Sequence, residues 1–97
     1  MRDQGQAPAA VRARGEIDLD TAPSLRRALT AALETYREVV LDLSEVTFMD
    51  CAGLDAIVQA RNQADRCGGR LVLRGAGRRV VRLLKLTGLN RRLTVGP

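Results

Sequence analysis

Histidine and tryptophan are both absent from this 97-residue sequence, and aromatic residues make up only 2% of it. Without an imidazole the chain lacks the side chain that most often moves protons in enzymes at neutral pH. Two cysteines alone do not complete a zinc site. Tyr36 and Phe48 are the only aromatic residues, so stacking platforms for single-stranded nucleic acid are not expected. We therefore predict a protein that is not an enzyme and that has neither cofactor nor metal.

Long apolar runs are also missing. No run approaches the roughly 20 residues that a membrane-spanning helix needs, and residues 1–11 lack the apolar segment of a secretory signal. We expect a cytoplasmic protein without a membrane span. A chain of 97 residues that is 45% apolar fits one hydrophobic core. The predicted organisation is a flexible segment over residues 1–8 and a single domain over residues 9–97.

Acidic residues are absent from the last third of the chain. Residues 1–65 hold seven basic and eleven acidic side chains, whereas residues 66–97 hold nine basic side chains and no acidic one. Such asymmetry is typical of a surface for nucleic acid or for an acidic protein, or of solvated helix faces. No recognition motif accompanies the charge, so specific nucleic-acid binding is not expected. The basic residues after Arg66 are Arg70, Arg74, Arg78, Arg79, Arg82, Lys85, Arg91 and Arg92.

The stretch from Val39 to Val58 organises the rest of the chain. Its first residues, 39–43, are aliphatic except for Asp42, which predicts a strand in the middle of a sheet. A polar loop is expected over residues 44–50, with Phe48 and Met49 as its apolar underside. A helix is expected from Ala52 to about Arg66, capped by Asp50 or Cys51. The free N–H groups at such a helix start make it the first place to look for a site.

Strands and helices alternate along the remaining sequence. An edge strand is predicted over residues 9–14, followed by a turn at residues 15–18 and an amphipathic helix that contains Leu25, Leu29 and Leu33. A strand over residues 71–73, a helix over 78–86 and a last strand over 93–95 complete the order. This order predicts an α/β fold with a mixed or mostly parallel sheet of four to five strands and about three helices packed against it.

The segment LDLSEVTFMDCAGLDAIV resembles the signature of the STAS domain of bacterial anti-sigma factor antagonists. The element GEID at residues 15–18 resembles a second family element that lies beside the first. In that family the second of two hydroxyl residues after the Asp is phosphorylated by an anti-sigma factor kinase, and phosphorylation releases the partner. The matching positions are Cys51 and Ala52, so the residue at the phosphoacceptor position has no hydroxyl.

The resemblance implies a non-catalytic regulatory module that binds a protein, such as an anti-sigma factor of the kinase type, through the start of this helix. Two alternatives stay open: a scaffold or sensor domain of a larger signalling complex, and a redox-sensitive protein that uses the thiol of Cys51. Cys51 and Cys67 lie about 24 Å apart at ~1.5 Å per helical residue, too far for a disulfide. The oligomeric state is left open. The candidate partner-binding residues are Asp18, Asp50, Cys51, Ala52, Gly53 and Asp55.

Overall fold

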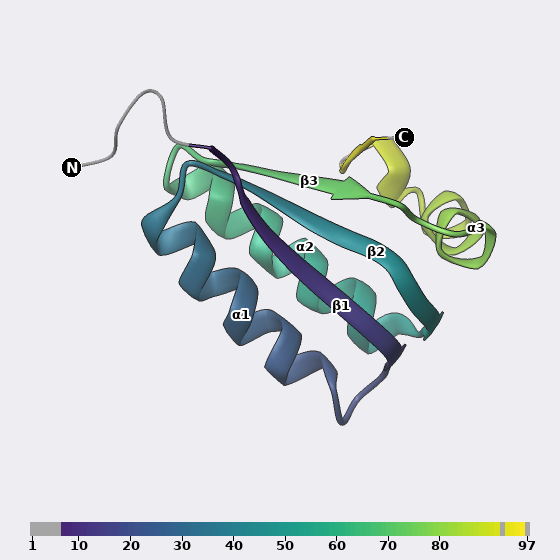
Figure 1. Ribbon diagram of the computed structural model, residues 1–97. Coiled ribbons are helices and arrows are strands. Elements are labelled where there is room, and N and C mark those ends of the chain that lie inside the picture. The colour runs from purple at the N-terminus through teal and green to yellow at the C-terminus, as the bar shows by residue number, and fades with distance from the viewer. Residues whose placement is uncertain (1–6, 92, 97) are drawn as a thin grey trace.

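The computed structural model describes residues 7–91 and 93–96 and shows strands alternating with helices, which confirms the predicted α/β class (Figure 1). The expected flexible segment at residues 1–8 falls largely outside the described residues. The elements are β1 (Ala9–Ile17), α1 (Ala22–Thr35), β2 (Glu38–Met49), α2 (Cys51–Arg66), β3 (Arg70–Arg74), α3 (Arg78–Thr87), the 3-10 turn η1 (Leu89–Arg91) and β4 (Thr94–Val95).

The sheet has the order β1-β2-β3-β4, and every neighbouring pair is parallel. Three full strands carry it, and β4 adds only two residues beside β3. The expected count of four to five strands is therefore not confirmed. Within the described residues no antiparallel pair occurs, so the sheet is parallel rather than mixed. β2 is the central long strand, because it is paired with β1 on one side and β3 on the other.

The polar loop expected over residues 44–50 is wrong, because β2 continues to Met49. The pairing of β1 with β2 shifts register twice, and at each shift β2 carries one more residue than β1. Such bulges leave extra residues unpaired and interrupt the alternation of buried and exposed side chains. Ser44 and Glu45 are both exposed at the first bulge, which makes this part of the strand look like a loop in the sequence.

The turn expected at residues 15–18 is also shorter than predicted. β1 runs on through Gly15 and Glu16 to Ile17, with Gly15 at a positive φ of 67° beside the second register shift. A glycine adopts this conformation at no steric cost, so the strand can bend there without ending. Both β1 and β2 therefore extend further toward their carboxyl ends than the sequence indicated.

Helices α1 and α2 lie side by side on one face of the sheet, while α3 lies beyond the end of β3 (Figure 1). α1 follows the N-cap residue Thr21 and has Pro23 in its first turn. Its buried residues recur at helical spacing and face the strands. The largest fully buried side chains of the core are Leu29, Leu41, Leu43, Ile57, Leu73, Leu84 and Val39, drawn from the three helices and from β2 and β3.

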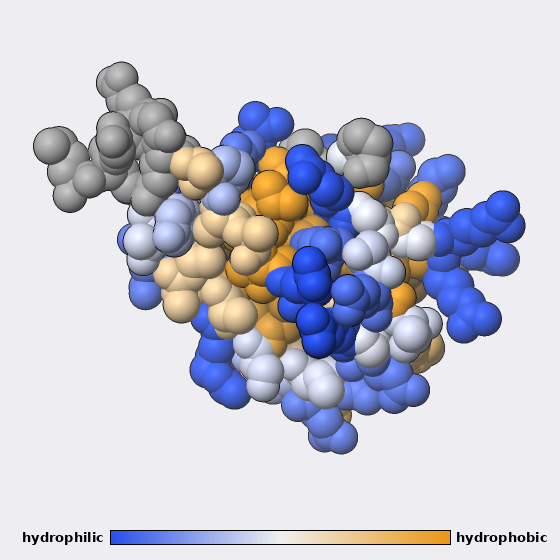
Figure 2. All heavy atoms as spheres, viewed as in Figure 1, coloured by the Kyte–Doolittle hydropathy of each residue, from blue (hydrophilic) through white to orange (hydrophobic). Residues whose placement is uncertain are grey.

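The opposite face of the sheet carries charged side chains around a partly exposed apolar centre (Figure 2). The Arg12 Nε atom lies 3.8 Å from a carboxylate oxygen of Asp42. The pKa of the Asp42 carboxyl lies below its ordinary value of 3.8, first because the Ser44 backbone N–H donates to it, and further because of the Ser44 hydroxyl and the positive charges of Arg12 and Arg74. The ionised form of Asp42 is thus favoured in the folded protein.

None of the described helices is long and apolar enough to pass through a lipid bilayer.

Replacing Asp42 by Asn tests this charge arrangement. Asn still accepts the hydrogen bond from the Ser44 N–H but removes the negative charge, so Asp42→Asn should lower the free energy of unfolding at neutral pH. Because the folded pKa is depressed, the contribution of the carboxylate is present above the ordinary value of 3.8 and is lost as pH falls through the lower folded pKa. Urea titrations across this range should therefore show the free energies of unfolding of the native chain and of Asp42→Asn converging in acid. A difference that stays constant with pH would contradict a stabilising role of the Asp42 charge.

Candidate functional site: the start of helix α2

The start of α2, residues 50–55, forms an exposed corner where β2 turns into the helix, and we call it the α2 corner. Asp50 is the N-cap residue, as predicted. Its Oδ1 atom accepts hydrogen bonds from the backbone N–H groups of Ala52 at 2.9 Å and Gly53 at 3.3 Å. These bonds satisfy two of the N–H groups that a helix start leaves free. The Asp50 side chain is therefore committed to holding the corner in shape.

The corner is fixed to the strand ends by close backbone packing. The Asp50 backbone N–H donates to the Ile17 carbonyl oxygen at 3.2 Å, which joins the ends of β1 and β2. A Cβ atom added at Gly53 would lie 2.7 Å from Met49 Cγ and 2.9 Å from Ile17 Cγ2. Ile17 and Met49 are paired in the sheet and are both buried. Only glycine fits at residue 53 without displacing them.

The two residues between the cap and this glycine differ in exposure. Cys51 is exposed, whereas Ala52 is half-buried and packs against the core. Cys67, the C-cap residue of α2, is exposed as well, and both cysteines are free. They lie at opposite ends of the 16-residue α2, too far apart for a disulfide between them.

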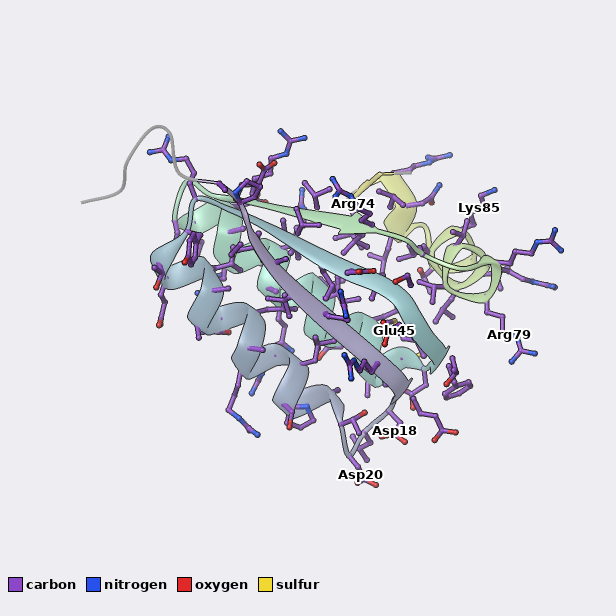
Figure 3. The ribbon with its side chains drawn as sticks, viewed as in Figure 1. Asp18, Asp20, Glu45, Arg74, Arg79 and Lys85 are labelled. Carbon is purple, nitrogen blue, oxygen red and sulfur yellow. The ribbon has the colours of Figure 1, made fainter. Side chains whose placement is uncertain are left out.

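Asp18 lies next to the corner in space, because the carbonyl of the preceding residue, Ile17, accepts a hydrogen bond from the Asp50 backbone N–H. Its carboxylate, however, is used within its own loop. The Asp18 Oδ1 atom accepts from the backbone N–H of Asp20 at 3.0 Å and from that of Thr21 at 3.2 Å. Asp18 and Asp20 project at the end of β1 in Figure 3. The geometry gives Asp18 the role of a turn carboxylate that shapes the loop beside the corner.

Asp55, the last residue of the corner, is linked to the neighbouring helix α1 through Gln59. Its Oδ2 atom accepts a 2.6 Å hydrogen bond from the Gln59 side-chain amide, and Gln59 Oε1 accepts a 2.8 Å bond from Arg26 of α1. This chain of polar groups spans the groove between α1 and α2. It borders a shallow depression of about 210 Å³ next to Ala52. The depression is lined by Leu19, Ala22, Pro23, Arg26, Ala52, Asp55, Ala56 and Gln59.

Two apolar side chains near the corner were not predicted as site residues. Leu19 is 77% exposed in the loop between β1 and α1, and Phe48 is 46% exposed on β2. Phe48 was expected to anchor a loop, but it is exposed on β2 beside the second register shift, next to the buried Met49. A leucine between two aspartates in a turn was the available signal for Leu19. Exposed apolar residues of this kind are typical of protein contact surfaces.

In the part of the chain that the structure describes, no group of three or more acidic or cysteine side chains is placed to hold a metal ion.

A family model described as "STAS domain" matches residues 2–97. The chain belongs to the STAS domain family. An anti-sigma-B factor antagonist from Bacillus subtilis (strain 168) is 36% identical to this STAS domain over 75 residues, which cover 77% of this chain and 69% of that protein.

Solved structures show the same fold. An anti-sigma factor antagonist from Mycobacterium paratuberculosis superposes with a TM-score of 0.80 at 30% identity, covering 91% of this chain and 75% of the other. The unphosphorylated form of the anti-sigma factor antagonist SpoIIAA gives a TM-score of 0.78 at 16% identity, covering 98% and 85%. This STAS domain is therefore similar in sequence and in fold to regulatory antagonist proteins, as its signature segment indicated.

Gly53→Ala tests the packing that fixes the α2 corner. Because the added methyl group meets Met49 and Ile17 well inside contact distance, we expect a loss of about 1–3 kcal/mol in the free energy of unfolding, although alanine is the better helix former. Gly77→Ala is the matched control, since a Cβ there has no neighbour within 4 Å. Chemical denaturation should show the larger loss for Gly53→Ala; equal losses would mean that the contact is relieved without cost.

Proposed function

We propose that this STAS domain is a non-catalytic regulatory module of the anti-sigma factor antagonist type, which binds its protein partner through the α2 corner. The observation that carries the proposal is the geometry of that corner: Cys51 is exposed and Ala52 is half-buried on a helix start that is held by the Asp50 cap and the close packing of Gly53. A surface that is already ordered loses little conformational entropy when it binds. The anti-sigma-B factor antagonists that resemble the chain support this reading.

The partner that fits this proposal is an anti-sigma factor of the kinase type. Contacts would come from Cys51, Ala52 and the exposed side chains nearby, with Leu19 and Phe48 as apolar additions on either side. Asp18, Asp50 and Gly53 would act by shaping the surface, since their groups are engaged in the loop, in the cap and against the strands. This division separates residues that touch a partner from residues that position them.

Phosphorylation at residue 52 is chemically excluded, because alanine has no hydroxyl group. A phosphate would add nearly two negative charges to a packed surface and would repel the partner. The corner of this chain keeps its charge when the kinase and ATP are present, so the complex persists. Constitutive binding is the expected behaviour, and any control must act at another residue.

The Ala52 side chain is the direct test. The native chain, Ala52→Ser and Ala52→Asp are titrated with a kinase-type anti-sigma factor from the source organism by calorimetry, with and without ATP. The native chain and Ala52→Ser should bind alike without ATP, and Ala52→Asp should bind at least about tenfold more weakly. With ATP, only Ala52→Ser should gain phosphate by mass spectrometry and lose affinity.

The exposed Ala28 on α1 provides the control for this series. Ala28→Asp adds the same charge away from the corner and should leave affinity unchanged. Phosphate found on Ser44 or Thr47 of the native chain would mean that binding is controlled by phosphorylation of β2 instead. A well-folded native chain that binds no such anti-sigma factor would refute the proposed partner.

A further inference from the structure

Helix α3 presents a basic outer face at the edge of the molecule. Arg78, Arg79, Arg82 and Lys85 are all exposed, and we call these four residues the α3 basic face. Figure 3 shows Arg79 and Lys85 extending away from the body of the protein. The inner side of the same helix is anchored by Val80 and Leu84, which are buried in the core. The helix is therefore held in place while its charges point outward.

These four cations are not neutralised within the described residues. The ion pairs found there involve Arg12, Arg14, Arg61 and Arg70, and none includes a residue of α3. The sequence also contains no acidic residue after Asp65, so no neighbour along the chain supplies a counter-charge. A cluster of unpaired guanidinium groups attracts carboxylates and phosphates, both of which it can bind through two hydrogen bonds.

An apolar recess lies between the charges. It favours a protein segment that carries carboxylates over a phosphate group. A depression of about 400 Å³ on α3 is lined by Ala76 and Val81 together with Arg78, Arg82 and Lys85. Its apolar residues offer nothing to a phosphate group, but they can receive an aliphatic side chain while the rim binds carboxylates. Combining an apolar anchor with surrounding arginines is typical of protein interfaces.

We propose that the α3 basic face is a second docking surface, which binds a protein segment that carries an apolar side chain flanked by acidic residues. Nucleic acid is less well matched, because the recess would stay empty and no aromatic side chain lies among the basic ones. A membrane surface is also less well matched, because Val80 and Leu84 are buried in the core and the exposed Leu86 alone does not form the apolar face of an interfacial helix. This surface is distinct from the α2 corner, and the inference does not rest on the proposed function.

Two short synthetic peptides test the proposal. Both contain glutamate and serine at equal net charge, and one has a central leucine where the other has serine. Binding is followed by fluorescence polarisation at physiological salt with the whole chain. The leucine peptide should bind at least about tenfold more tightly than its serine counterpart. Arg82→Glu should abolish binding of both peptides, and Val81→Ser should remove the difference between them.

Matched variants separate this surface from the rest of the protein. Arg27→Glu reverses an exposed charge on α1 and should leave both peptides bound as before. Ala52→Asp alters the α2 corner and should also leave peptide binding unchanged. A failure of the proposal for one surface would therefore leave the proposal for the other untouched. Circular dichroism establishes that each variant is folded.

Three results would overturn the proposal. Equal affinity for the two peptides would show that they are attracted by charge alone. If the folded native chain bound neither peptide, the α3 basic face would not be a docking surface. Tighter, Arg82-dependent binding to a DNA duplex of random sequence, or to phosphatidylserine-containing vesicles, would assign the face to nucleic acid or to lipid instead.

Discussion

The close approach of α2 to the ends of β1 and β2 is the contact on which the candidate site depends. At Gly53 the helix backbone lies so near to Ile17 and Met49 that a side chain has no room. The Asp50 backbone N–H reaches the Ile17 carbonyl at the same point, while the Asp50 carboxylate caps the helix. Interior packing resists small changes in volume, so these contacts specify one position for the helix start. The exposure of Cys51 and the half-buried place of Ala52 follow from that position.

The features that the sequence predicted correctly are those with local causes. The helix from residue 51 to 66 follows from the spacing of its apolar residues and from the Asp50 cap. The exposure of Cys51 follows from the same cap. Alternation of strands and helices was enough to predict a mixed or mostly parallel sheet, because each helix returns the chain in the same direction.

The features that were missed depend on pairing between distant segments. The two register shifts of β2 against β1 are invisible in either strand alone, so residues 44–49 appeared to be a loop. The exposure of Phe48 is likewise a result of the strand register. The carboxylate of Asp55, within the corner, accepts from Gln59 one turn further along α2, and Gln59 is bound in turn to Arg26 of another helix. The contact with Arg26 could not be inferred from the local sequence around residue 55.

The two bulges of β2 also bear on how such a domain can vary between relatives. Each bulge adds a residue to β2 without lengthening its neighbour β1, so the end of β2 can be moved forward while the sheet behind it keeps its pairing. Insertion or loss of a single residue there would shift the helix start by a small step, and α2 with it. A relative with a different number of bulges would therefore have to repack the contacts of Ile17 and Met49 with Gly53.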